Sequence, residues 1–322
     1  MEKTAILLVN LGTPDAPYPN QVRTYLKEFL SDERVIDLPR WKWLPILNGI
    51  ILPRRSKKSA ALYQSIWTEE GSPLLVISKK QHAALAKRFL KDEIKVALAM
   101  TYGNPSIKDE LEKLHKWGVR HLIVLPMYPQ YSSTTVAPIW DRVQREISTW
   151  IDIPKLTFIR DYPDLPKFIE VNVHRIQQCI AENGEPEAVV VSYHGIPLHY
   201  AQNGDDYEER CSRTTAALEK ALPQLTFIQC YQSKFGKDPW ITPNTSDIIV
   251  ELAKSGKKHI QVLAPGFTAD CLETLEELEV ENREYFHKAG GEKYFYLPAV
   301  NDDERFIDGL EELVRKEIHR NF

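Results

Sequence analysis

The chain contains a gapless internal repeat, which constrains its fold more than any other feature of the sequence. Residues 105–126 (PSIKDELEKLHKWGVRHLIVLP) superpose on residues 243–264 (PNTSDIIVELAKSGKKHIQVLA), with Gly118 matching Gly256. Each copy is typical of a helix that begins at a proline, ends at a glycine and leads into a buried strand. Two such units predict two similar halves, each a parallel sheet flanked by helices.

The rest of the chain alternates in the same way, which predicts an α/β protein with two Rossmann-like domains. We expect strands at 4–11, 94–100, 121–127, 154–159, 187–193, 225–231, 259–264 and 293–297. We expect helices at 20–30, 74–91, 105–117, 137–149, 165–182, 208–221, 244–255, 271–288 and 303–319. The halves should span 1–162 and 163–302, with the seam in RDYPDLP (160–166) and a ligand cleft between them.

Composition excludes several classes of function. With 322 residues and a net charge of −4, the chain has no basic footprint for nucleic acid. The N-terminus lacks the pattern of a signal peptide, so we expect a cytoplasmic protein. LLVNLGTPDAP lacks the glycine spacing of a dinucleotide fingerprint, and the P-loop pattern is absent. The four cysteines have no C-x-x-C spacing, so we expect reduced structural thiols.

Two polar segments follow buried strands, where ligands bind in open α/β sheets. SYHGIP (192–197) supplies His194, and PGFTADCLETLEELEVENREYF (265–286) supplies Asp270 and a helix. Glutamates recur on that helix at intervals of four, four and three: Glu273, Glu277, Glu281 and Glu284. Such spacing places carboxylates along one helical face. A histidine facing them could move protons, hold a divalent cation, or do both.

Nine motifs distributed along the chain resemble those of ferrochelatases, the proteobacterial type most closely. In order they are LLVNLGTPDAP, FLSDERVID, LYQSIW, GSPL, TYGNPSI, LPMYPQYSSTT, SYHGIP, QSKFGKDPWITP and PGFTADCLETLEE. The resemblance implies a lyase that inserts Fe²⁺ into protoporphyrin IX to form protohaem, the terminal step of haem biosynthesis. It also implies that the helix within 303–322 packs on the first half.

The resemblance further implies roles for individual residues. His194 and Glu273 would be the catalytic and metal-binding residues, on the two faces of the ring. The candidate path for protons or metal comprises Glu277, Glu281 and Asp270. The candidate porphyrin contacts are Leu11, Thr13, Tyr102, Tyr128, Ser233 and Trp240. Tyr102 and Trp240 occupy corresponding positions in the two halves, which leaves two interpretations: they stack on a flat aromatic ligand, or they are ordinary aromatic residues near a core.

No prosthetic group is expected, because Fe²⁺ is a substrate. Iron–sulfur ferrochelatases often carry a cysteine-bearing C-terminal extension, and no cysteine follows Cys271, so we expect no cluster. Two other functions remain open: a chelatase for coproporphyrin or sirohydrochlorin, and a two-lobed haem- or metal-binding protein without catalytic activity.

The stretch LPRWKWLPILNGIILPRRSKK (38–58) is apolar, carries Trp41 and Trp43, and has cationic flanks. It is too short to span a bilayer, whereas tryptophan beside cations suits a membrane interface. In ferrochelatases this region forms one lip of the pocket. The sequence leaves two interpretations open, a transient membrane contact and a covered surface helix.

Overall fold

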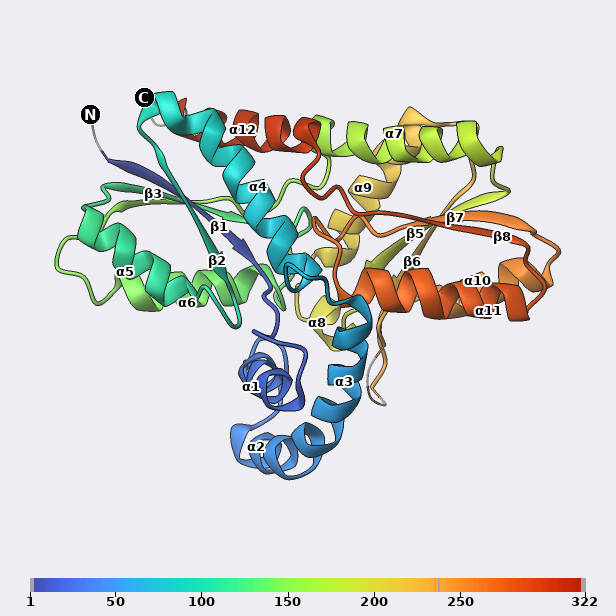
Figure 1. Ribbon diagram of the computed structural model, residues 1–322, viewed down its shortest axis with the longest axis horizontal. Helices are drawn as coiled ribbons and strands as arrows, with labels where there is room; N and C mark the ends of the chain where they lie inside the picture. The colour runs from blue at the N-terminus through green and yellow to red at the C-terminus, as the bar shows by residue number, and fades with distance from the viewer. Residues whose placement is uncertain (1–2, 235, 237, 320–322) are drawn as a thin grey trace. The chain divides into compact units, whose positions relative to one another are not determined.

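The computed structural model describes residues 3–234, 236 and 238–319 and divides into two compact units (Figure 1). The first unit comprises the residues up to Tyr128, Ser132–Asp161 and the residues from Leu310 on. The second comprises Pro129–Tyr131 and Tyr162–Gly309. The last helix therefore begins in the second unit and continues into the first.

Each unit contains a four-stranded parallel sheet, and the two sheets have the same strand order. The first sheet has the order β2-β1-β3-β4, and the second has the order β6-β5-β7-β8. Their strands are β1 (Thr4–Asn10), β2 (Lys95–Met100), β3 (His121–Pro126), β4 (Lys155–Phe158), β5 (Ala188–His194), β6 (Phe227–Gln232), β7 (His259–Leu263) and β8 (Lys293–Leu297). The predicted fold class is confirmed, and each predicted strand is present with its ends shifted by two residues at most.

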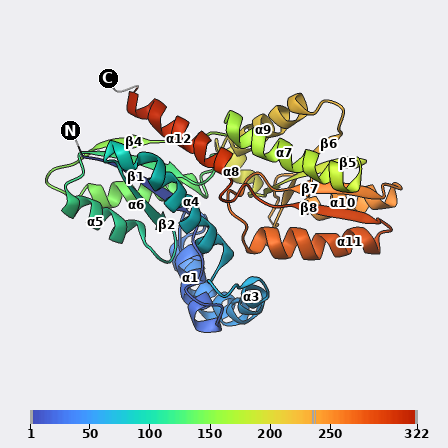
Figure 2. The same ribbon diagram turned by 45° about the horizontal axis from the view of Figure 1, so that its top comes forward.

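Helices alternate with the strands. They are α1 (Pro19–Leu30), α2 (Arg40–Ile46), α3 (Leu52–Ile66), α4 (Pro73–Phe89), α5 (Ile107–Trp117), α6 (Val136–Ile147), α7 (Pro166–Asn183), α8 (Leu198–Gln202), α9 (Tyr207–Ala221), α10 (Thr245–Lys254), α11 (Arg283–Lys288) and α12 (Glu304–His319). Wider π-helical turns occur at η1 (Leu47–Ile51) and η3 (Glu273–Asn282), and a 3₁₀ turn at η2 (Leu90–Asp92). In the second unit α7 and α9 lie on one face of the sheet and α10 and α11 on the other (Figure 1, Figure 2).

The two copies of the sequence repeat fold alike, because each carries its own start and stop signals. Ser106 and Asn244 cap α5 and α10 by accepting hydrogen bonds from backbone N–H groups of the first turn. Gly118 ends α5 with a φ of 84°, in the left-handed region that glycine adopts without steric cost. The chain leading into each helix also turns alike, with Met100 N–H donating to Pro105 O and Tyr231 N–H to Pro243 O.

The central strands β1, β3, β5 and β7 are buried on both faces, as expected of parallel sheets covered by helices. All six residues of β3 and all five of β7 are buried. One apolar core forms between the first sheet and the α5–α6 side, centred on residues such as Leu122 and Val124. The other forms between the second sheet and the α10–α11 side, around Val190 and Leu278. These cores hold the strand ends, and the loops that leave them, in fixed positions.

Candidate active site

His194 is the last residue of β5, at the edge of the second sheet where polar loops begin. It lies in register with Gln232, the last residue of the neighbouring strand β6. Parallel strands end at the same edge, so the loops after β5 and β6 emerge side by side. His194 is half-buried, whereas the six β5 residues before it are buried. The structure therefore places His194 at the C-terminal edge of the sheet rather than in a core, as the sequence predicted.

The backbone around His194 fixes the tautomer of its ring. His194 Nδ1 lies 2.7 Å from Gly195 O, and a carbonyl oxygen can only accept a hydrogen bond. The contact therefore assigns the proton of the neutral imidazole to Nδ1 and leaves the lone pair on Nε2. Gly195 N–H in turn donates to Gln232 O at 2.8 Å. A Cβ on Gly195 would lie 3.0 Å from both Gln232 O and a Trp240 ring carbon, so a larger residue here would push these neighbours aside.

The predicted glutamate helix is present, but its first part is a π-helix. The sequence predicted a continuous α-helix over 271–288, whereas Glu273–Asn282 form η3 and only Arg283–Lys288 form the α-helix α11. Two side-chain donors satisfy carbonyls of the wide turns. Asn282 donates to Glu277 O at 2.7 Å, and Tyr294 of β8 donates to Leu278 O at 2.6 Å. Wide turns of this kind are frequent at functional sites.

Glu277 is the carboxylate that the structure ties to the His194 edge. Its oxygens accept hydrogen bonds from Ser233 N–H at 2.8 Å, from the Ser233 hydroxyl and from Gln232 Nε2 at 3.3 Å. Burial raises the pKa of Glu277, while the Ser233 hydrogen bonds and the His194 charge lower it and the Glu273 charge raises it. His194, Glu273 and Glu277 are thus close enough for their charges to interact. This cluster can accept protons and attract a divalent cation.

The outer glutamates lie in solvent. Glu281 is exposed and accepts a hydrogen bond from the Tyr285 hydroxyl. Glu284 is exposed and forms an ion pair with Lys288, one turn along, at 2.6 Å. The glutamates along this helical face therefore differ in their surroundings: the Glu277 carboxylate is fixed by hydrogen bonds, whereas the Glu284 carboxylate is solvated.

Asp270 is not part of this group of carboxylates. The carboxylate is buried and accepts four hydrogen bonds, from Tyr296 Oη (2.7 Å), Thr274 Oγ1 (3.0 Å), Ala299 N (3.2 Å) and Asn301 Nδ2 (2.7 Å). These donors fill its acceptor positions and tie the start of η3 to the loop after β8. The proton- or metal-path role that the sequence suggested for Asp270 gives way to an anchoring role.

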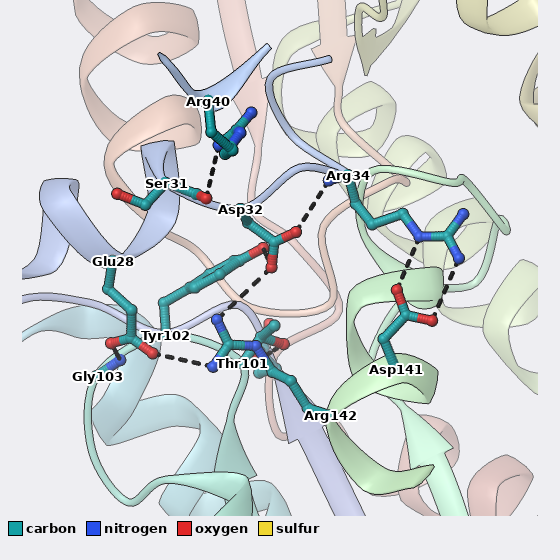
Figure 3. Close-up of polar contacts among 11 residues, drawn as sticks. Glu28, Ser31, Asp32, Arg34, Arg40, Thr101, Tyr102, Gly103, Asp141 and Arg142 are labelled. Atoms are coloured by element: carbon teal, nitrogen blue, oxygen red, sulfur yellow. Dashed lines mark hydrogen bonds and ion pairs between the residues drawn. The ribbon is translucent and has the colours of Figure 1, made fainter. Parts of the chain in front are cut away.

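Tyr102 is also placed differently from the prediction. Its ring is fully buried, with the Arg142 guanidinium 4.7 Å from the ring centroid, so it cannot stack on a ligand (Figure 3). The Tyr102 hydroxyl donates to Asp32 at 3.0 Å, and Arg142 donates to Glu28 at 3.1 Å. Burial and the Asp32 charge raise the pKa of Tyr102. These residues form an internal brace between α1, α6 and the loop after β2 in the first unit.

The other predicted porphyrin contacts differ in accessibility. Thr13 is buried, and its hydroxyl donates to Ser72 Oγ at 2.8 Å, which leaves it little access to a ligand. Leu11 and Tyr128 are half-buried at strand ends of the first unit, and Tyr128 packs against its core. Ser233 uses its N–H and hydroxyl on Glu277. Trp240 is half-buried against Gly195 and lines a cavity of about 250 Å³ together with Gln232.

Sequence reasoning missed the support provided by Gln232 and Ser192. Gln232 Nε2 also donates to Glu273 O at 3.1 Å, and Gln232 Oε1 accepts from Ser192 Oγ at 2.9 Å. Both residues lie within the motifs QSKFGKDPWITP and SYHGIP, so the signal was present. What the motifs could not show was that the parallel register sets Gln232 beside His194.

The structure limits what kind of metal site the protein offers. Within residues 3–234, 236 and 238–319, no three His, Cys, Asp or Glu side chains gather closely enough to enclose a metal ion. All four cysteines are free and buried. In the same part of the chain, no helix is both long enough and apolar enough to cross a membrane.

Comparisons with known proteins cover nearly the whole chain. The family model described as Ferrochelatase matches residues 3–318. The coproporphyrin III ferrochelatase of Symbiobacterium thermophilum is 56% identical over 320 residues, 99% of this chain and 100% of that protein. The ferrochelatase of Pectobacterium atrosepticum is 54% identical over 98% of each chain. SirB from Bacillus subtilis, solved with Fe³⁺, has a TM-score of 0.59 at 14% identity over 98% of this chain and 95% of its own, a likeness of fold.

Proposed function

The chain belongs to the ferrochelatase family, a group of porphyrin metal chelatases, and we propose that it inserts ferrous iron into protoporphyrin IX to form protohaem. The observation that carries this proposal is that Gln232, in register with His194, donates hydrogen bonds to both Glu273 O and the Glu277 carboxylate, so the three residues share one sheet edge. An imidazole with its lone pair on Nε2 and two nearby carboxylates supply proton acceptors and negative charge that attracts a cation, both of which metallation requires.

Metal insertion requires the porphyrin to lose two pyrrole protons and to receive a divalent cation. We assign the His194 ring, through Nε2, and the Glu273 carboxylate to opposite faces of the macrocycle. Glu277 and Glu281 continue from Glu273 toward solvent, so they supply a route for protons or hydrated iron. Insertion also requires the nitrogen lone pairs to point out of the ring plane. Binding energy from the rest of the macrocycle can drive that distortion.

Coproporphyrin III is the second candidate substrate, favoured by the 56% identity to a protein named coproporphyrin III ferrochelatase. The two porphyrins differ in their peripheral groups. Anaerobic assays with Fe²⁺ and each porphyrin, followed by the Soret band, distinguish them. We expect the larger kcat/KM for protoporphyrin IX. A larger value for coproporphyrin III would assign the second substrate.

The same assay tests catalysis against simple binding. Wild-type protein should convert the free-porphyrin spectrum into that of the metalloporphyrin, and His194→Ala should abolish this conversion while still binding porphyrin. A shifted band that stays constant with time in the wild type would indicate a binding protein instead. Near-wild-type kcat in His194→Ala would remove His194 from the mechanism.

We also propose that catalysis needs no prosthetic group and takes place in the cytoplasm. Ligation of an iron–sulfur cluster requires thiolates. Burial raises the pKa of Cys230 to about 12 and those of Cys211 and Cys271 well above the ordinary thiol value. These thiols therefore resist ionisation, which supports reduced structural roles.

The segment 38–58 supports a proposed transient contact with a membrane surface. Trp41, Leu38 and Ile50 are 74%, 49% and 48% exposed, on the segment that forms α2, η1 and the start of α3. Cationic side chains follow at Arg54, Lys57 and Lys58, all exposed. Exposed tryptophan beside cations matches the chemistry of an anionic lipid interface, from which a poorly soluble porphyrin could be collected.

A further inference from the structure

We infer that Ser233 is a positioning residue for metal insertion: it holds the Glu277 carboxylate in a fixed place relative to His194. This inference rests on the proposed function, because it assigns Ser233 a role within the same site. It also replaces the porphyrin contact that the sequence suggested for Ser233.

Ser233 grips both oxygens of one carboxylate. Its N–H donates to Glu277 Oε1 at 2.8 Å, and its hydroxyl donates to Oε2. Gln232 Nε2 adds a third contact to Oε2 at 3.3 Å. Hydrogen bonds to an ionised acceptor are about twice as strong as neutral ones, and a two-point grip fixes orientation as well as distance. Glu277 therefore has one preferred rotamer, unlike exposed Glu281.

The grip connects two elements that are far apart in sequence. Glu277 lies on η3, whereas Ser233 directly follows β6, whose last residue Gln232 is in register with His194. Gln232 itself is held from behind, since its Oε1 accepts from Ser192 Oγ and that hydroxyl lies 2.8 Å from Thr245 Oγ1. The carboxylate is thus tied through buried side chains to the strand pair that carries the histidine.

The backbone of Ser233 supports a specific role for its hydroxyl. Ser233 has a φ of 65°, in the left-handed region where residues other than glycine are uncommon. Glycine would adopt this conformation with less strain and would keep the N–H contact, but it would lose the hydroxyl. Serine therefore strains the backbone more than glycine would, but its hydroxyl supplies a second hydrogen-bond donor to Glu277.

Two substitutions separate the hydroxyl from backbone strain. Ser233→Gly and Ser233→Ala both remove the hydroxyl, but glycine relieves the positive φ and alanine does not. We expect a higher Tm for the glycine variant than for the alanine variant. We nevertheless expect both to lose roughly tenfold or more in kcat, as for a charge-assisted hydrogen bond, with KM for porphyrin within about twofold of wild type. If instead Ser233→Gly kept a higher kcat than Ser233→Ala in proportion to its higher Tm, Ser233 would act only through the stability of the fold.

A double-mutant cycle tests whether Ser233 acts through Glu277. In a Glu277→Ala background, Ser233→Gly should cause no further loss of kcat, because the group it positions is gone. An equal loss in both backgrounds, or wild-type kcat in Ser233→Gly alone, would overturn the inference. Glu93→Gly is the matched control, since Glu93 also has a positive φ of 56° but lies in the first unit, and its kcat should equal that of wild type.

The wild-type assay distinguishes failure of this inference from failure of the proposed function. Metal insertion by wild type together with unchanged Ser233→Gly kinetics would refute only the positioning role. Absence of insertion by wild type with any porphyrin and Fe²⁺ or Zn²⁺ would overturn the proposed function itself.

Discussion

Glu273 and Glu284 occupy the same run of helical turns in very different surroundings. Glu273 is half-buried and its charge acts on Glu277, whereas Glu284 is exposed and paired with Lys288. We therefore expect Glu273→Gln to lower kcat by about a hundredfold, as when an acid–base group is lost. Glu284→Gln should leave kcat within about twofold of wild type. Steady-state metallation kinetics check both, and equal effects would refute this distinction between the two glutamates.

The raised pKa of Glu277 predicts a pH dependence of stability. A folded-state pKa above the unfolded value means that the folded protein holds this proton more tightly, so the contribution of Glu277 to stability is largest at pH values below about 4.3 and falls as pH rises through its folded pKa. Glutamine cannot ionise. We expect Glu277→Gln to gain stability relative to wild type as pH rises above about 4.3, as measured by urea unfolding.

Glu284 provides the control of opposite sign. A hydrogen bond from Lys288 lowers the pKa of Glu284, so its contribution is present above the unfolded pKa and lost in acid. Glu284→Gln should therefore lose stability relative to wild type as pH rises, by a small amount because both groups are exposed. The same trend for the two variants would contradict the assignment for Glu277.

The positions of His194 and Glu273 in the fold could be predicted from the sequence, but the residues that support them could not. Both lie in polar segments that follow buried strands. Tyr102 shows why position alone is insufficient, because its partners Asp32 and Arg142 lie 70 and 40 positions away in the chain. Only the folded chain shows that this ring is covered on the inside of the first unit.

At the scale of elements, apolar periodicity and glycine or proline punctuation located every strand, because a strand buried on both faces reads as a short apolar run. The segment of α2, η1 and α3 was not among the predicted helices. Its first part is largely apolar, four cations follow in α3, and Pro45 and Pro53 interrupt the segment, so it lacks a clear 3.6-residue pattern. The π-helical geometry of η3 was likewise missed, because the sequence of a ten-residue segment does not distinguish π-helical turns from α-helical ones.

The brace around Tyr102 should stabilise the first unit measurably. Arg142 covers the Tyr102 ring and pairs with Glu28 and Asp32, so Arg142→Ala leaves two acidic groups without their cation (Figure 3). We expect a loss of roughly 2 kcal/mol in the free energy of unfolding. Arg145→Ala on the exposed side of α6 should cost less than about 0.5 kcal/mol. If urea unfolding gave Arg142→Ala and Arg145→Ala the same small loss in the free energy of unfolding, the brace would not be stabilising.

The cationic end of the 38–58 segment should govern vesicle binding. Arg54, Lys57 and Lys58 are exposed, whereas Arg55 is half-buried and its pKa is lowered by burial. Each exposed cation near an anionic surface contributes about 1 kcal/mol, screened by salt. Replacing the three exposed cations by Gln should weaken sedimentation with anionic liposomes at low salt and spare turnover on detergent-solubilised porphyrin.

A matched triple replacement on another helix provides the control. Lys79, Lys80 and Lys87 of α4 are exposed and remove the same charge when changed to Gln. That variant should bind liposomes like wild type. Equal weakening by both triple variants would indicate an effect of net charge alone, and no binding by wild type at low salt would remove the membrane contact.

For the whole molecule, the site chemistry predicts which metals are inserted. An imidazole with carboxylates suits borderline divalent ions, so Zn²⁺ and Co²⁺ should be inserted alongside Fe²⁺. Mg²⁺ prefers oxygen ligands and gives up its water reluctantly, and the chain has no P-loop to couple nucleotide hydrolysis to its dehydration. Spectra of protoporphyrin IX incubated with each metal check this selectivity. Efficient Mg²⁺ insertion would contradict the ligand set.

The two copies of the repeated αβ unit differ in the connection that leads into the helix. Four residues separate Met100 from Pro105 in the first copy (101–104), whereas eleven separate Tyr231 from Pro243 in the second (232–242). The longer connection contains Ser233 and Trp240, while the sheets on either side of the duplication keep the same strand order. The same αβ scaffold therefore accommodates connections of different length at this place, and the longer connection carries two of the candidate site residues.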